Sequence, residues 1–245
     1  MLSKMLKNSL LRSLEIKLHF YPMIFHAWSI PDAAARLSPR PQLTSLAMKL
    51  HGTIDPHLPL LVVAVNEEAD HLHNLGFPVL VTGAGKVNAS VATAVTIATN
   101  TPAMVINMGT AGALVDGLDG IHEVGGVIQH DLDDAALIAL TGVSFGPPIE
   151  LGEGPTLATG DVFVSDPALR AALAERAHLV DMEGYAVAKA AAAAGVPARL
   201  VKAISDSGDH AAATSWKDSV AECAHALAEW ATQNITPNAQ SSLTN

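Results

Sequence analysis

Residues 201–209 read VKAISDSGD, an apolar run that ends in Asp206 and passes into a turn of Ser and Gly. The run predicts a buried strand, so that Asp206 follows the end of the strand. In α/β sheets, ligand sites form at the carboxyl ends of strands, and an acid placed there is a candidate for chemistry. Asp206 is therefore our first candidate for a catalytic residue.

A second acid, Glu183, has a similar setting in the stretch LVDMEGYA at 179–186. There an apolar run gives way to a helical stretch of small residues, and neither Glu183 nor Asp206 has an adjacent Lys or Arg in the sequence. Two unpaired acids at strand exits favour a reactive site. The alternative interpretation is that one acid caps a helix and the other faces solvent.

From His57 onward, short apolar runs alternate with Ala-rich helical stretches, which is typical of strands connected by crossover helices in a largely parallel sheet. The apolar runs predict strands at 60–65, 79–82, 103–107, 125–129 and 156–158. The Ala-rich stretches predict helices at 88–98, 166–176, 185–194 and 215–232.

Three segments that contain glycine follow predicted strands and are predicted turns: 82–86, 109–112 and 159–161. Glycine lets the backbone approach a ligand and leaves amide donors free at helix starts. None of the three matches a dinucleotide fingerprint or a phosphate-binding loop, so we expect no cofactor.

Composition limits the class of protein. The chain has 245 residues, of which 49% are hydrophobic, and this suffices for a substantial core. A net charge of −10 and an aromatic content of 4% argue against nucleic acid as a partner. Cys223 is the single cysteine, so an internal disulfide and a Cys-based metal site are impossible. This favours a reducing compartment, and we expect a cytoplasmic protein.

The N-terminal part differs from the rest, because residues 1–55 carry seven Lys or Arg against three acids. Residues 18–28 are too short and too polar for a spanning helix, and we expect no membrane partner. A transit segment or a membrane-surface helix is one interpretation; a weakly ordered extension ahead of Met48 is the other, and we favour it. We therefore expect an extension at 1–56, a catalytic domain at 57–234 and a polar tail at 235–245.

Taken in order, several blocks resemble the nucleoside phosphorylase and nucleosidase superfamily, and most of all the 5′-methylthioadenosine/S-adenosylhomocysteine nucleosidases. The resemblance spans roughly residues 58–233 and implies a three-layer α/β/α fold with a central mixed sheet. The blocks are VAVNEEA at 63–69, GAGKVNA at 83–89, INMGTAG at 106–112, QHDLD at 129–133, TGDVFV at 159–164, DMEG at 181–184 and ISD at 204–206.

The resemblance also implies roles for two catalytic residues. Asp206 would deliver a proton to N7 of a purine, so that the base leaves as a neutral molecule. Glu68 would orient and deprotonate the attacking water, although its neighbour Glu67 is an alternative match, and a first-turn acid can also simply complement the helix dipole.

A set of substrate-binding residues follows from the same matches. Glu183 would accept hydrogen bonds from the ribose hydroxyls, and Phe163 would stack on the base, unless Phe163 is plain core. Met182 would line the sugar, unless it only fills space. The full expected set is Glu183, Met182, Phe163, Val164, Thr82, Gly83 and Ser205. The pair His130 and Asp131 lacks a third ligand at suitable spacing, so we expect no metal.

Hydrolysis is favoured over phosphorolysis because phosphate needs a fixed cation, and no arginine occupies a matching turn. The substrate would be 5′-methylthioadenosine or S-adenosylhomocysteine, and the protein a homodimer. Alternatives are a purine nucleoside phosphorylase and a nucleoside-binding protein of the same fold without turnover. The chain is shorter than similar proteins between Glu68 and Thr82, where they insert an additional strand pair, and between Asp133 and Thr159, where they carry an extra helix.

Overall fold

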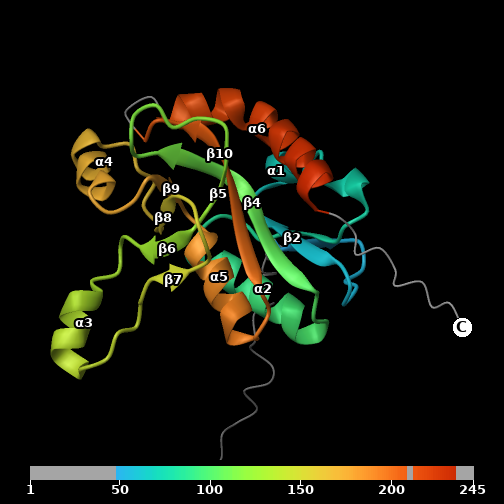
Figure 1. Cartoon of the computed structure of the whole chain (residues 1–245), viewed down its shortest axis with the longest axis horizontal. Helices are drawn as coiled ribbons and strands as arrows, with labels where there is room; N and C mark the ends of the chain where they lie inside the picture. Colours follow the sequence, from blue (N-terminus) through green and yellow to red (C-terminus); the bar gives the residue numbers. More distant parts are fainter. Residues whose placement is uncertain (1–47, 209–211, 236–245) are drawn as a thin grey trace, which may run out of the picture. The chain divides into compact units, whose positions relative to one another are not determined.

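The computed structural model describes residues 48–208 and 212–235, and these contain one ten-stranded mixed sheet flanked by helices (Figure 1). The strand order is β1-β3-β2-β4-β9-β8-β6-β7, with β10 paired to β4 and β5. The strands are β1 (Lys49–His51), β2 (Pro59–Val63), β3 (Val79–Val81), β4 (Met104–Ala113), β5 (Ile121–Glu123), β6 (Gly126–Gln129), β7 (Ile149–Glu150), β8 (Thr156–Thr159), β9 (Leu179–Asp181) and β10 (Ala198–Asp206). The helices are α1 (Asn66–Ala69), α2 (Lys86–Thr99), α3 (Asp134–Thr141), α4 (Pro167–Ala174), α5 (Gly184–Ala193) and α6 (Ala212–Asn234), with a 3-10 turn η2 (His73–Leu75).

The central strands are apolar on both faces because both faces are covered. In β2, Leu61 and Val63 pack in the core shared with α6, whereas Leu60 and Val62 pack in the core shared with α2 and α5. Successive side chains of a strand point to opposite faces, so a continuous apolar run fills two layers at once. The three-layer α/β/α fold expected from the sequence is confirmed (Figure 1).

The helix ends follow local rules. Asp166 caps α4, where its carboxylate accepts a hydrogen bond from the amide of Ala168 at 2.9 Å, and Pro167 opens the helix. After α5, Gly195 adopts a positive φ of 69°. All four predicted helices are present, at bounds shifted by a few residues.

One predicted turn is wrong. Residues 109–112 continue β4 as strand, because β10 runs parallel beside them and pairs with each residue from Gly109 to Gly112. Neither glycine has a positive φ, so the two serve a purpose other than turning the chain.

Several elements escaped the sequence patterns. The sheet begins before residue 57, because β1 pairs antiparallel with β3. The short strands β5 and β7 and the eight-residue helix α3 also had no prediction, and α3 lies in the segment expected to be shortened. The expectations for residues 1–47 and for the tail beyond 235 lie outside the described residues. Within 48–208 and 212–235, no helix is both long enough and apolar enough to cross a membrane.

Candidate active site

Three acids from distant parts of the chain line one cavity of about 250 Å³: Glu68 of α1, Glu183 before α5 and Asp206 at the end of β10. Of the other residues expected from the sequence, four also line it: Met182, Phe163, Val164 and Ser205. Thr82 and Gly83 do not belong to the lining, although the next residue, Ala84, does. The Thr82 hydroxyl is instead bonded to the carbonyl oxygens of Val63 and Gly83, at 3.2 and 2.9 Å.

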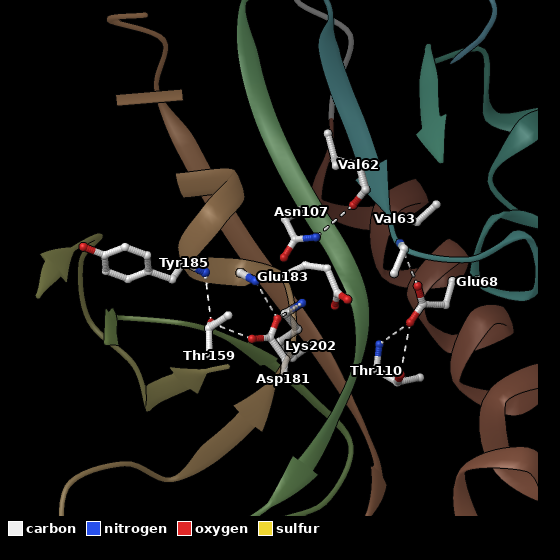
Figure 2. Close-up of polar contacts among 12 residues, drawn as sticks. Val62, Val63, Glu68, Asn107, Thr110, Thr159, Asp181, Glu183, Tyr185 and Lys202 are labelled. Carbon is white, nitrogen blue, oxygen red and sulfur yellow. Dashed lines mark hydrogen bonds and ion pairs between the residues drawn. The ribbon is translucent and has the colours of Figure 1, made fainter. Parts of the chain in front are cut away.

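The Glu68 carboxylate is held on both oxygens (Figure 2). Its Oε1 accepts from the amide and the hydroxyl of Thr110, at 2.8 and 3.0 Å. Its Oε2 accepts from the amides of Ala64 and Val65, at 3.0 and 3.4 Å. Glu68 is 3% exposed, whereas its neighbour Glu67 is exposed, so it is Glu68 that faces the cavity.

Asp206 is aimed by an irregularity in its strand. The pairing of β10 with β4 shifts register between Ile204 and Asp206, which is how a bulge redirects a side chain. One carboxylate oxygen of Asp206 accepts from the Ser205 hydroxyl and the other from the amide of Gly208, both at 2.8 Å. Arg170 holds the following turn, because its Nε donates to the carbonyl oxygen of Ser207 at 2.7 Å.

The two glycines of β4 explain why both acids fit against the strand. A Cβ at position 109 would stand 2.9 Å from Oε1 of Glu68, and one at position 112 would stand 2.9 Å from Oδ1 of Asp206. Real side chains almost never approach so closely. Residues 109–112, which the sequence predicted as a turn, are thus part of a strand. Its two glycines have no side chains and so leave space for two carboxylates.

Glu183 is also buried, with 8% of its surface exposed. Its Oε1 accepts from the amide of Gly85 at 2.7 Å, and Gly85 has a positive φ of 92° that directs this amide. Burial, with the added repulsion of the Asp181 carboxylate, raises the pKa of Glu183 to about 8. A pKa of about 8 keeps the Glu183 carboxyl mostly protonated near neutral pH.

A buried cation that the sequence did not suggest lies beside this acid. Lys202 is 2% exposed, and its Nζ is 2.8 Å from Oδ2 of Asp181 (Figure 2). Asp181 also accepts from the Thr159 hydroxyl at 2.6 Å and from the Gly184 amide at 2.8 Å. Burial alone would lower the pKa of Lys202, but the carboxylates of Asp181 and Glu183 reverse the effect and raise it. Glu183 has no adjacent cation in the sequence, but in the folded protein the charge of Lys202 acts on it.

The open side of the cavity is apolar. Val162 and Phe163 are 52% and 44% exposed, and Trp216 of α6 adds a second aromatic ring to the lining. Trp216 and Thr110 were missed by the sequence patterns, because a single Trp in an amphipathic helix and a Thr in a predicted turn carry no signal of their own. Only the block INMGTAG, which contains Thr110, pointed to the neighbourhood.

Cations are absent from the cavity lining in the described part of the chain. Lys86 lies outside it, where its Nζ donates to Oε1 of Gln129 at 3.0 Å and pairs with Asp131. Asp131 also accepts from the amide of Asp161 at 2.8 Å. Lys86 is therefore paired with the segment at 129–131, which in turn contacts Asp161. The cavity lining itself consists of carboxylates, other polar groups and apolar side chains.

Comparison with known proteins identifies the family of this chain. Residues 126–236 match the phosphorylase superfamily. A 5′-methylthioadenosine/S-adenosylhomocysteine nucleosidase from Shewanella sp. (strain W3-18-1) is 30% identical over 158 residues, which cover 52% of this chain and 67% of the relative. A second nucleosidase of this name, from Bacillus thuringiensis (strain Al Hakam), is 32% identical, with 66% of its length covered.

Solved structures share the fold. The Helicobacter pylori nucleosidase, as an Asp-to-Asn mutant with 5′-methylthioadenosine in its active site, gives a TM-score of 0.65 at 24% identity, covering 72% of this chain and 96% of its own. The arrangement is thus that of an α/β protein with a cavity lined by three acids. The chain belongs to the phosphorylase superfamily.

Proposed function

We propose that this protein hydrolyses the N-glycosidic bond of a purine nucleoside. The observation that carries the proposal is the meeting of Glu68, Glu183 and Asp206 around one cavity, in whose lining the described residues include no Lys or Arg. An anionic nucleophile such as phosphate needs a fixed cation, whereas water needs only a base. The site therefore favours water over phosphate.

In the proposed reaction, Glu68 takes a proton from a water molecule, whose oxygen forms the new bond to C1′. Asp206, in its protonated form, gives its proton to N7 as the bond from C1′ to the base breaks, so the base departs neutral. Glu183 accepts hydrogen bonds from the ribose hydroxyls as positive charge develops on the sugar.

The base and the 5′ substituent occupy the apolar side of the cavity. Phe163 stacks on the base, the backbone of Val164 reads its edge, and Met182 lies against the sugar. Ser205 supports the acid through its hydroxyl, which donates to Asp206 at 2.8 Å. Since the curated relatives are named for 5′-methylthioadenosine and S-adenosylhomocysteine, we infer a substrate with a thioether at the 5′ position.

One assay separates this function from its alternatives. Purified protein is incubated with 5′-methylthioadenosine, S-adenosylhomocysteine, adenosine and inosine, each with and without phosphate, and the sugar product is identified. We expect free sugar and no effect of phosphate. A sugar 1-phosphate would establish a phosphorylase, and saturable binding without product would establish a binding protein.

We also infer a homodimer, working in the cytoplasm. In α2, Val87, Val91 and Val95 are 71%, 46% and 53% exposed and share one face at helical spacing. Helix α3 has no buried residue although it is mostly apolar, and Leu140 is 81% exposed. A second copy would cover these side chains, as large exposed apolar patches favour association.

The dimer is tested by light scattering after size-exclusion chromatography. The wild type should elute with twice the mass of the chain, and Val91→Glu should shift it towards a monomer, because a charge would be buried in the contact. Val220→Thr, within the core side of α6, serves as a control for stability, since it leaves the α2 face intact. A monomeric wild type at micromolar concentration would contradict the inference.

A further inference from the structure

Trp216, in the cavity lining, is linked by hydrogen bonds to Glu68, the acid that we propose orients the attacking water. Its indole Nε1 donates to Oγ1 of Thr110 at 2.9 Å, and this hydroxyl donates to Oε1 of Glu68 at 3.0 Å. The three side chains come from α6, β4 and α1, and all three line the cavity. Segments more than a hundred residues apart in sequence therefore meet in a single hydrogen-bonded chain.

The chain of hydrogen bonds has a fixed direction. An indole N–H can only donate, while a hydroxyl has one proton to donate and lone pairs to accept. Once the indole occupies an acceptor position of the Thr110 hydroxyl, the hydroxyl proton is left for the carboxylate. The same oxygen of Glu68 also accepts from the Thr110 amide at 2.8 Å, so two donors from one residue fix it.

We propose that Trp216 is a positioning residue for Glu68, acting through Thr110. The proposal rests on the proposed function, in which Glu68 orients the attacking water. By holding the hydroxyl, the indole fixes Oε1 of the carboxylate against β4 and so sets the orientation of Glu68 in the cavity. Linked hydrogen bonds of this kind strengthen one another in a partly buried site.

The rest of α6 supports this role. The Ser219 hydroxyl lies 2.9 Å from the carbonyl oxygen of Ser205 and 2.7 Å from that of Ser215, and Cys223 donates from its thiol to the carbonyl oxygen of Ile204 at 3.5 Å. Positions 216, 219 and 223 lie on one face of a helix. The face of α6 that carries Trp216 therefore also contacts the end of β10, next to Asp206.

The test removes only the N–H group. Trp216→Phe keeps an aromatic ring in the cavity wall but cannot donate to Thr110. We expect kcat to fall about threefold to tenfold, as for the loss of one hydrogen bond, while KM stays within about twofold. The matched control is Trp230→Phe in the same helix, because Trp230 packs on Arg199, with the guanidinium carbon 5.1 Å from the ring centroid, and does not line the cavity. The control should leave kcat unchanged.

A double-mutant cycle shows whether Trp216 acts through Thr110. Thr110→Val removes the hydroxyl, and in that background Trp216→Phe should cause no further loss of kcat. In Thr110→Ser, which keeps a hydroxyl, the effect of Trp216→Phe should persist. Unchanged kcat in Trp216→Phe, or an undiminished effect in the Thr110→Val background, would overturn the proposal.

A measurement without turnover keeps the hydrogen bond separate from the proposed function. The indole N–H signals are assigned by NMR from the two Trp→Phe variants, and their exchange with solvent is followed. The Trp216 signal should exchange faster in Thr110→Val than in the wild type, while that of Trp230 should not change. If the Trp216 signal exchanges equally fast in Thr110→Val and in the wild type, the hydrogen bond from Trp216 to Thr110 is refuted. A wild type that fails to release sugar would refute only the proposed hydrolase function.

Discussion

At the scale of single residues, Gly112 shows how a missing side chain determines where an acid can stand. Asp206 pairs with Gly112 across the strands, and a Cβ at position 112 would also come within 3.1 Å of Cγ1 of Val180. Val180 is buried in the core and cannot move easily, whereas the partly buried Asp206 carboxylate is held only by hydrogen bonds from Ser205 and Gly208. The carboxylate is therefore the group that must move.

We accordingly expect Gly112→Ala to reduce kcat/KM by at least about tenfold, since displacements near 1 Å already cost about a hundredfold in well-oriented sites. The control is Gly126→Ala in β6, where the nearest atom to an added Cβ is 3.4 Å away. Steady-state kinetics of both variants decide the matter. Equal activity of the two would mean that the bare surface at position 112 is unrelated to the acid.

Glu183 gives a prediction about pH. Its pKa rises from the usual 4.5 to about 8 in the folded protein, mainly through burial, so folding favours its protonated form. The stabilisation is complete below pH 4.5 and is lost as the pH rises through 8. The melting temperature of the ligand-free wild type should therefore fall, relative to that of Glu183→Gln, between these two pH values. A constant difference across the range would show that Glu183 ionises as it does in the unfolded chain.

At the scale of elements, β10 and β9 are joined by the buried pair of Lys202 and Asp181. Sequence patterns identified the strand that carries Lys202 but gave no reason to find a cation inside it. Only the packing of β4 and α5 around the strand buries its side chain, which lies in the centre of an otherwise apolar run. A lysine in a strand sequence is ordinarily read as an exposed position, and this is why the pair was missed.

We expect Lys202→Met to lower the free energy of unfolding by about 3 to 5 kcal/mol, since it leaves the Asp181 carboxylate buried without its partner. Adding Asp181→Asn should restore part of the loss, because the uncompensated charge is then removed. Urea denaturation of the wild type and of both variants measures this. A single variant as stable as the wild type would show that the pair contributes nothing to the fold.

Helices and central strands were predictable because their patterns are local. The two layers of β2 follow from an unbroken apolar run, and the start of α4 follows from Asp166 and Pro167. The extent of β4 was not predictable, because residues 109–112 are strand through pairing with β10 and Ala113 through pairing with β9. Two-residue and three-residue strands such as β7 and β5 likewise depend on partners distant in sequence.

At the scale of the whole molecule, the fold brings separate motifs to one place. The blocks around Glu68, Glu183 and Asp206 lie at ends of β2, β9 and β10, and the topology of the sheet carries all three to the same cavity. Sequence patterns could name these residues, because each follows an apolar run. They could not identify Trp216 or Thr110, whose importance depends on hydrogen bonds between elements, and the roles of all these residues stay predictions.

The most direct test is a crystal structure of the Asp206→Asn variant soaked with 5′-methylthioadenosine. The variant should be inactive and folded, because an amide cannot supply the proton but has nearly the same shape. We expect intact nucleoside with N7 facing position 206, the ribose hydroxyls at Glu183, and C1′ facing Glu68 with room for one water between them. A nucleoside bound outside this cavity, or with its base turned away from position 206, would contradict the account.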